Sequence, residues 1–203
     1  MLISGPTGSG KTRLVFDLLC DHEHTTTIGK SVIRVLYCYG IWQDFYDSFS
    51  HPRVDITFHD GFCYDYADMR PDIIVVDDLM EEMSRDKQLV AMFTKTSHHK
   101  GISVVFLTQN IFFQSKHMRT ISLNSHYIIL LKNPRDQQQV MTLGRQIYPT
   151  NSSFFNQAYE EAVKEPYSHL IIDMTSSCPD ALRLRRRNVV KGQAGFVIFE
   201  MRQ

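Results

Sequence analysis

The sequence has no apolar run long enough to cross a membrane and no cysteine spacing typical of a disulfide framework. Its longest apolar runs are the size of single strands, whereas a bilayer-spanning helix needs about 20 residues. The first residues lack the basic and apolar parts of a signal peptide. Four scattered cysteines suit free thiols in a reducing compartment. We therefore expect an intracellular protein without a membrane partner.

Net charge is also lacking, because 22 Lys and Arg residues balance 22 Asp and Glu residues over 203 positions. Residues 1–100 nevertheless hold 10 basic and 15 acidic residues, and residues 101–203 hold 12 and 7. The densest basic run consists of Arg183, Arg185, Arg186, Arg187 and Lys191. Such a cluster on a neutral chain indicates a surface for a polyanion such as DNA, or for a neighbouring subunit. The alternative is a strand in which exposed arginines partly alternate with apolar residues.

Short apolar runs alternate with amphipathic stretches along the chain, which is typical of an α/β fold with a mainly parallel sheet. The predicted strands are Met1–Ser4, Val32–Tyr39, Val54–Phe58, Asp72–Val76, Ile102–Leu107, His126–Leu131, His169–Asp173 and Gly195–Glu200. The predicted helices are Lys11–Cys20, Leu79–Ser97, Arg135–Tyr148 and Phe154–Lys164. We expect a core over residues 1–175 and a basic C-terminal extension, 176–203, packed on the same domain.

Two further clusters favour structural roles over chemical ones. Helical spacing relates four aromatic residues, Trp42, Phe45, Tyr46 and Phe49. Base stacking is one explanation for them, but burial statistics favour a core helix. Three side chains with metal-binding chemistry lie together at Cys20, His22 and His24. A fourth ligand at suitable spacing is lacking, so a solvated loop is favoured over a metal site.

The sharpest signal is a glycine-rich loop between the first strand and the first helix. Its residues are Gly5, Pro6, Thr7, Gly8, Ser9, Gly10, Lys11 and Thr12, which match the P-loop pattern in full. Glycines let the loop curl so that its N–H groups point at phosphates, and the helix N-terminus adds positive potential. Lys11 is expected to reach the β- and γ-phosphates, and Thr12 to offer its hydroxyl to Mg²⁺. The loop therefore predicts binding of a nucleoside triphosphate.

A second acidic signal follows the apolar run Ile73–Val76. Asp77, at the end of that strand, is placed to support Mg²⁺. Asp78 is placed to orient or deprotonate the attacking water. The alternative for Asp78 is the N-cap of the following helix, because a carboxylate stabilises a helix start. Both roles are compatible.

Polar residues also end the strand Ile102–Leu107, where Gln109 is predicted to touch the γ-phosphate and the lytic water. The alternative is an ordinary turn at a strand end. Together with the acidic strand, this order of motifs fits the branch of P-loop NTPases that has an additional strand between the P-loop strand and the acidic strand.

At this level of detail the chain resembles a known family, the viral genome-packaging ATPases of the FtsK/HerA superfamily. The similarity is closest to the poxvirus-like ATPases of Polinton (Maverick) elements, adintoviruses and virophages. Besides the P-loop and the Asp77–Asp78 strand, it rests on the segments Phe93–Asn110, Arg119–Tyr127, Leu131–Asp136, Gly144–Pro149 and Pro166–Asp173. The stretch from Phe93 to Pro149 is more specific to the family than the P-loop.

The resemblance implies a three-layer, RecA-like P-loop ATPase of the branch with the additional strand. It implies a homo-oligomeric ring that uses ATP and Mg²⁺ to thread double-stranded DNA into a capsid, working with a portal or vertex protein. Such a motor acts inside the host cell at virion assembly sites, or in the virion. By position, Lys11, Asp78 and Gln109 would be catalytic, and Thr12 and Asp77 would support the metal.

Two departures from the family pattern stand out. Related translocases carry Glu where this chain has Asp78, and an arginine that acts in trans where this chain has His98. Candidates for the missing arginine finger are Arg119, Arg135 and Arg145, each of which is equally well explained as a structural ion-pair partner. Two alternatives remain open: another FtsK/HerA-type or helicase-like DNA motor, and a degenerate NTP-binding scaffold for capsid assembly. The predicted first strand begins at Met1, which leaves open whether a segment precedes it.

Overall fold

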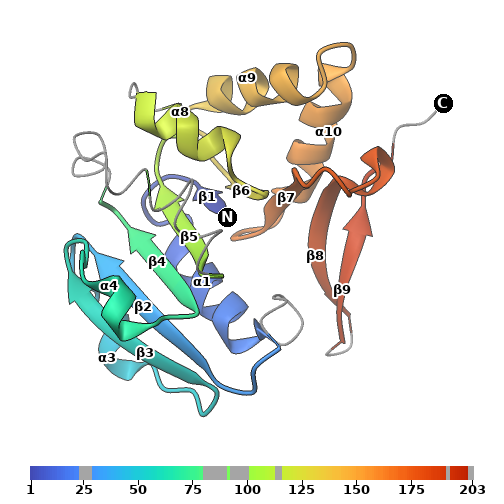
Figure 1. Ribbon diagram of the computed structural model, residues 1–203. Coiled ribbons are helices and arrows are strands. Elements are labelled where there is room, and N and C mark those ends of the chain that lie inside the picture. Colours follow the sequence, from blue (N-terminus) through green and yellow to red (C-terminus); the bar gives the residue numbers. More distant parts are fainter. Residues whose placement is uncertain (23–28, 80–90, 92–100, 113–115, 191–192, 201–203) are drawn as a thin grey trace.

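A single sheet of nine strands organises the molecule (Figure 1). The computed structural model describes residues 1–22, 29–79, 91, 101–112, 116–190 and 193–200. The strands are β1 (Leu2–Ser4), β2 (Ile33–Tyr39), β3 (Val54–Asp60), β4 (Ile73–Asp77), β5 (Ser103–Thr108), β6 (Tyr127–Leu131), β7 (His169–Asp173), β8 (Leu184–Val190) and β9 (Gln193–Ile198). Their order across the sheet is β3-β2-β4-β5-β1-β6-β7-β8-β9. The eight predicted strands are all present, with bounds that differ by up to two residues.

The strands from β3 to β6 across the sheet run parallel, and those from β7 onward join antiparallel. β5 pairs with β1 on one side and with β4 on the other. The acidic strand is therefore separated from the P-loop strand by one additional strand, as the order of motifs predicts. Parallel strands bring their carboxyl ends to one edge of the sheet, where open α/β folds bind their ligands.

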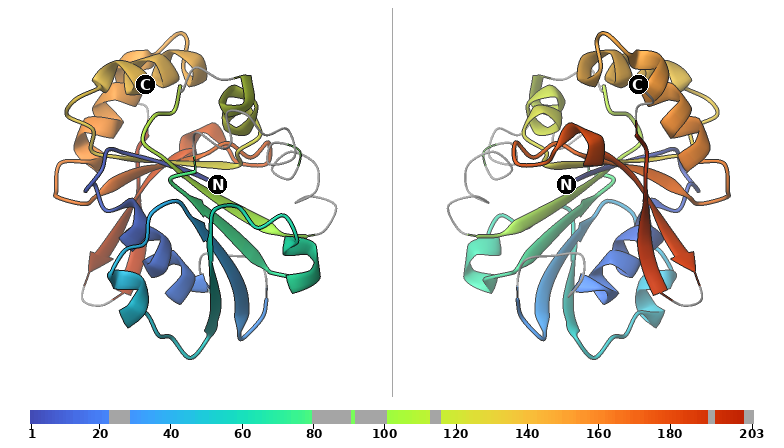
Figure 2. Two further views of the ribbon diagram at one scale, coloured as in Figure 1. Left: turned by 90° about the vertical axis from the view of Figure 1, so that its left-hand side faces the viewer. Right: turned by 90° about the vertical axis from the view of Figure 1, so that its right-hand side faces the viewer.

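Helices cover both faces of the sheet (Figure 2). They are α1 (Lys11–Cys20), α3 (Phe45–Ser48), α4 (Tyr66–Met69), α8 (Lys116–Leu123), α9 (Gln137–Ile147) and α10 (Ser152–Ala162), with a 3₁₀ turn η2 at Asp180–Leu182. One core layer packs α1 and α3 around the fully buried Phe16 and Tyr37. The other packs α9 and α10 around Phe106 and Phe155. The three-layer α/β architecture expected from the sequence is confirmed.

The contact between α9 and α10 explains one glycine. A Cβ atom on Gly144 would lie 2.5 Å from Cδ1 of Phe155, far closer than van der Waals contact allows. Phe155 is fully buried at this contact. The absence of a side chain at position 144 therefore allows the two helices to pack against each other over the sheet.

Two predicted helices differ from the structure or lie outside its described part. The aromatic spacing at 42–49 predicts two helical turns, but α3 has only four residues. Tyr46 is buried, and Phe45 and Phe49 surround Phe16 as the core interpretation requires, while Trp42 stays 43% exposed. Nearly all of the predicted helix Leu79–Ser97 lies outside the described residues. In the described part of the chain, no helix is long and apolar enough to span a bilayer.

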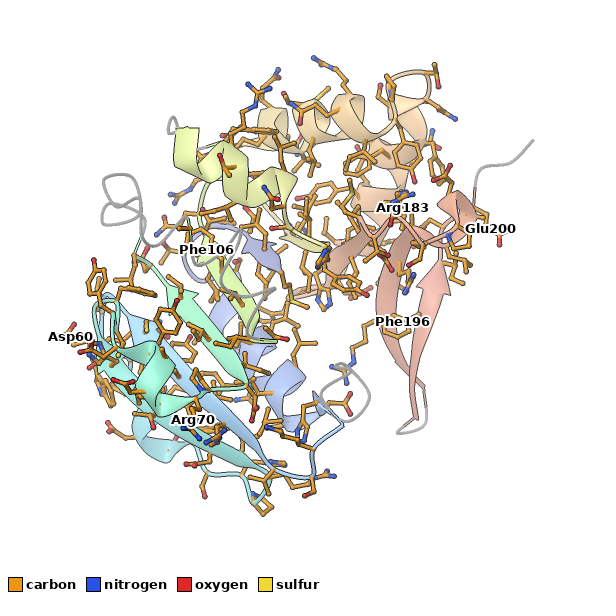
Figure 3. All side chains as sticks on the ribbon, in the orientation of Figure 1. Asp60, Arg70, Phe106, Arg183, Phe196 and Glu200 are labelled. Atoms are coloured by element: carbon orange, nitrogen blue, oxygen red, sulfur yellow. The ribbon has the colours of Figure 1, made fainter. Side chains whose placement is uncertain are left out.

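The C-terminal segment continues the sheet as the hairpin β8–β9. The second strand is predicted outright, and the first is the strand that the sequence offers as the alternative explanation of the arginine run. Arg183 binds Asp180, Arg185 binds Asp173, and the charged groups are 2.7 and 2.8 Å apart. Arg187 binds Asp21 at the end of α1, also at 2.8 Å. Figure 3 shows Arg183 at the base of this hairpin. These contacts favour the structural alternative for the three arginines, and their contact with DNA stays a prediction.

Candidate nucleotide-binding site

The loop from Gly5 to Thr12 has backbone angles that only glycine adopts without strain. Gly8 and Gly10 have φ values of 76° and 95°, in the left-handed region. Gly5 is needed for space, because a Cβ there would lie 2.7 Å from Oγ of Ser9. Gly10 forms the N-cap of α1, so the helix starts directly at the loop. The local fold is therefore an anion-binding loop with a helix N-terminus behind it.

Lys11 folds back over this loop. Its Nζ donates hydrogen bonds to the carbonyl oxygens of Gly5 and Pro6, at 2.7 and 3.0 Å. Burial lowers the pKa of Lys11, and the carboxylates of Asp77 and Asp78 oppose that shift. The ammonium thus lies between the loop and two carboxylates, where a phosphate would compensate its charge.

Asp77 ends β4 as a buried carboxylate, only 5% exposed. Its Oδ2 accepts hydrogen bonds from Thr12 (3.2 Å), Tyr37 (2.6 Å) and Tyr46 (3.3 Å). Burial raises the pKa of Asp77, and these three hydrogen bonds oppose the rise. The two tyrosines were missed at the sequence level, since β2 and α3 bring them to Asp77 through long-range packing. They fix one oxygen of the carboxylate in place.

Tyr37→Phe tests this positioning. The substitution removes a short hydrogen bond to the ionised carboxylate, so the pKa of Asp77 should rise further. Because Mg²⁺ binds the ionised form, the Mg²⁺ concentration for half-maximal ATP hydrolysis should increase about tenfold, as expected for a lost bond to a charged group. Loss of activity on acidification should also begin at a higher pH.

Tyr159→Phe is the matched control, because it removes a buried hydroxyl that donates instead to the carbonyl of Leu131. It should leave the Mg²⁺ requirement and the acid limb of the pH profile unchanged. A Tyr37→Phe variant that only lowers thermal stability would contradict the positioning role.

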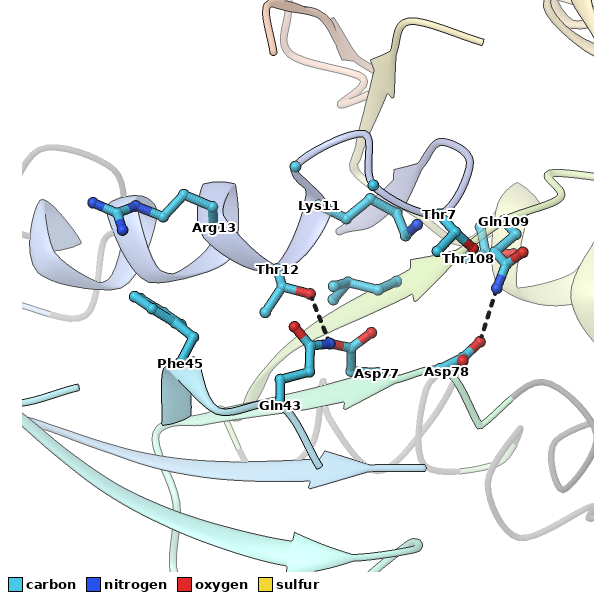
Figure 4. Close-up of a pocket in the computed structure, with 13 residues that line it drawn as sticks. Thr7, Lys11, Thr12, Arg13, Gln43, Phe45, Asp77, Asp78, Thr108 and Gln109 are labelled. Atoms are coloured by element: carbon cyan, nitrogen blue, oxygen red, sulfur yellow. Dashed lines mark hydrogen bonds between the residues drawn. The ribbon is translucent and has the colours of Figure 1, made fainter. Parts of the chain in front are cut away.

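Asp78 and Gln109 meet at the mouth of the pocket, where both are exposed. Nε2 of Gln109 donates to Oδ1 of Asp78 at 3.3 Å (Figure 4). Asp78 has a φ of 59°, which is uncommon for a residue with a side chain. Its carbonyl oxygen lies over Gly40, where any Cβ would approach it to 2.8 Å. The structure thus brings the two predicted catalytic side chains together on neighbouring strands.

These residues line one pocket of about 420 Å³ (Figure 4). Gln43 also lines it, and its Nε2 donates to Oγ1 of Thr12 at 3.4 Å. Sequence reasoning missed Gln43, because only the fold places the end of β2 beside the P-loop. A volume of this size suits a small-molecule ligand.

The donors in the pocket fit a magnesium ion. The hydroxyl of Thr12 and the carboxylate of Asp77 supply oxygen ligands, which Mg²⁺ prefers. A bound cation would also compensate the charge of the buried Asp77. In the described ranges, no group of three or more His, Cys, Asp or Glu side chains could hold a metal. Phosphate oxygens and water would therefore complete the coordination.

His22 corrects one expectation, since the segment from Cys20 to His24 is predicted to be a solvated loop. The His22 side chain is buried, and its ring nitrogens lie 3.0 and 3.1 Å from the carbonyl oxygens of Leu19 and Lys30. Its ring therefore connects the end of α1 to the segment that precedes β2. His24 lies outside the described residues.

The three candidate arginine fingers do not reach the pocket of their own chain. Arg119, Arg135 and Arg145 are all exposed, and none is among the lining residues. They lie in or next to α8 and α9, on the other face of the sheet from α1. His98 lies outside the described residues.

No family model and no curated protein matches the sequence. Solved structures do match the fold. The genome-packaging NTPase B204 of Sulfolobus turreted icosahedral virus 2, solved with ATPγS, superimposes with a TM-score of 0.56 at 12% identity. The match covers 87% of this chain and 92% of that one. The chain has the fold of the P-loop NTPases.

Two further structures share this P-loop fold. The DNA-packaging ATPase B204 of Sulfolobus Turreted Icosahedral Virus gives a TM-score of 0.58 at 12% identity, over 87% of this chain and 93% of that one. The type VII secretion ATPase EccC of Thermomonospora curvata gives 0.54 at 14% identity. That match covers 91% of this chain but 24% of EccC.

Proposed function

We propose that the protein is an ATPase that couples hydrolysis to the movement of double-stranded DNA into a viral capsid. The observation that carries the ATPase part is one pocket lined by Lys11, Asp77, Asp78 and Gln109 on a P-loop fold. Similarity of fold to B204, described as a DNA-packaging ATPase, supports the packaging part. The poxvirus-like subtype rests on the sequence resemblance.

The loop would bind the β- and γ-phosphates through its N–H groups and through Lys11. Nζ of Lys11 donates hydrogen bonds to the carbonyl oxygens of Gly5 and Pro6. Phosphate oxygens, which carry full negative charge, are better partners for an ammonium than carbonyls are. A bound Mg²⁺ would neutralise charge that develops on the phosphates, held by Thr12 and Asp77.

Asp78 would accept a proton from the attacking water while the oxygen of that water bonds to the γ-phosphorus. The bond between the γ-phosphorus and the bridging oxygen would break, and ADP would leave with that oxygen. Asp78 is exposed to the pocket, and its neighbour Asp77 is buried, so the two carboxylates have different roles. Gln109 donates to Asp78, and its amide would turn to the γ-phosphate of a bound nucleotide. This change of hydrogen-bond partner would distinguish the state before hydrolysis from the state after it, and β5, which Gln109 follows, would transmit the difference.

A ring of identical subunits would complete the site. The arginine finger would be one of three residues, Arg119, Arg135 or Arg145. All three are exposed and lie outside the pocket of their own chain, so the finger would act on the nucleotide of a neighbouring subunit. A capsid portal or vertex protein would be the docking partner. The protein would act in the host cell at virion assembly sites, or in the virion.

The test is ATP hydrolysis with linear double-stranded DNA, with single-stranded DNA and without DNA. We expect double-stranded DNA to raise the rate several-fold and the rate per subunit to increase with protein concentration. Stimulation by single strands alone would indicate a helicase-like motor. Nucleotide binding without any hydrolysis would indicate a scaffold and contradict the proposal.

A further inference from the structure

The connection between α10 and β7 lies beside the P-loop. β7 runs antiparallel to β6, and its first residue, His169, pairs with Leu131 at the end of β6. The connection therefore arrives at the same edge of the sheet as the loop that precedes α1. Figure 2 shows the two segments next to each other, although about 160 residues separate them in the chain.

Tyr167, in this connection, combines three uncommon properties. Its ring touches the P-loop, since Cδ1 lies 3.0 Å from the position of a Cβ on Gly10. It is nevertheless 72% exposed, although it is a large aromatic residue. Its φ is 61°, a left-handed conformation that costs free energy for any residue with a Cβ. Backbone strain of this kind is concentrated at functional sites.

A triphosphate bound along the P-loop would have its nucleoside end near the ring of Tyr167. Asp78 and Gln109, expected at the γ-phosphate, lie on the side of β1 that faces β5 and β4. A triphosphate with its last phosphate at that side, and the others along the loop, places its nucleoside at the opposite side of β1. That side holds β6, β7 and the connection with Tyr167.

Phe45 is the alternative platform, because it lines the pocket, whereas Tyr167 borders the P-loop at Gly10 just outside the lining residues. Its ring is half-buried against Phe16 and Phe49, and the guanidinium of Arg13 lies over it at 5.2 Å from the centroid. Phe45 also belongs to α3, which follows β2 on the side of the sheet where the acidic strand lies. Tyr167 is therefore better placed to receive a base.

We propose that Tyr167 is the platform on which the base of the bound nucleotide stacks, so that the site takes nucleoside triphosphates with little discrimination between adenine and guanine. The proposal deepens, and rests on, the proposed nucleotide site. Every base presents a π-face to an aromatic ring, so stacking gives affinity without selecting one base.

The test compares equilibrium binding of three probes: ATPγS, GTPγS and inorganic tripolyphosphate, which has no base. Tyr167→Ala should weaken ATPγS and GTPγS about tenfold each, as expected for one lost stacking contact, and leave tripolyphosphate unchanged. Tyr167→Phe should bind all three as the unmodified protein does. Tyr167→Leu, which keeps apolar bulk without a ring, should resemble the alanine variant.

Tyr64→Ala is the matched control, because Tyr64 is 53% exposed and follows β3, the edge strand on the side of the sheet away from β7 and the P-loop. It should change the binding of none of the probes. If Tyr167→Ala weakens the binding of all three probes equally, the proposal is overturned. The ring would then only support the P-loop at Gly10. Unchanged binding of ATPγS would place the base elsewhere. A strong preference for one purine would overturn the proposed lack of discrimination.

The binding experiment contains no DNA, so a failure of DNA-coupled hydrolysis leaves its result standing. Failure of the unmodified protein to bind either ATPγS or tripolyphosphate would overturn the nucleotide site itself, and the proposal with it.

Discussion

Replacing Lys11 with alanine should abolish measurable ATP hydrolysis. The substitution removes the ammonium that faces the two Asp carboxylates and the phosphate position. Loss of one charged group that stabilises developing charge costs about 10² to 10³ in rate, and this lysine also contributes to binding. The variant loses the two hydrogen bonds from Nζ to the carbonyl oxygens of Gly5 and Pro6, but it also removes the cost of burying an ammonium, so we expect thermal stability to change little. Phosphate release at saturating ATP and a melting curve measure the two effects.

Lys132→Ala is the control for this prediction. Lys132 is exposed just after β6, at the same edge of the sheet, but it does not line the pocket. It should hydrolyse ATP at the normal rate. Hydrolysis by a folded Lys11→Ala variant at more than a tenth of the normal rate would show that the loop is not the phosphate site.

Asp78→Asn should separate binding from turnover. An amide cannot accept the proton of the attacking water, so the rate should fall about 10²- to 10⁴-fold. Affinity for ATPγS should stay close to normal, because Lys11 and the loop are intact. Single-turnover hydrolysis and equilibrium binding measure the two quantities on the same preparation.

Asp60→Asn is the matched control, since Asp60 is exposed at the end of β3 on the same edge of the sheet. It should leave both quantities unchanged. If Asp78→Asn hydrolyses ATP normally, Asp78 is not the base, and its role is that of a helix cap, which asparagine fills as well as aspartate does.

The strands and the phosphate loop were predictable because their signals are local. A continuous apolar run, such as Ile73–Val76, indicates a strand buried on both faces, and the structure buries that run completely. The P-loop pattern contains its own backbone requirements, and Gly8 and Gly10 adopt the left-handed angles that it needs. Neither inference depends on distant parts of the chain.

Other elements gave no such signal. β8 contains three consecutive arginines, so it lacks the alternation that marks a half-buried strand. Arg185 and Arg187 are instead paired with acids from elsewhere, Asp173 and Asp21, and Asp21 is 166 residues away from Arg187 in the chain. At 42–49 the aromatic spacing suggests two turns, but packing around Phe16 needs only the short α3.

The sequence predicts the site residues that follow a strand or belong to a motif. It does not predict the tyrosines that contact those residues from other elements. Asp77 and Gln109 end their strands, which places them at the ligand edge of a parallel sheet. Tyr37 reaches Asp77 only because β2 pairs with β4 in a register that matches Tyr37 with Val75. Tyr167 reaches Gly10 only because β7 returns antiparallel to β6. The register of β2 on β4 and the antiparallel return of β7 have no local signal in the sequence.

Displacement of a DNA triplex measures ATP-driven movement along double-stranded DNA. A third strand is bound on linear duplexes at increasing distances from the end at which the motor loads. We expect displacement that requires ATP hydrolysis, begins after a delay proportional to that distance and is absent with Asp78→Asn. An intact triplex while the protein hydrolyses ATP, or displacement without hydrolysis, would contradict the proposed ATP-driven movement.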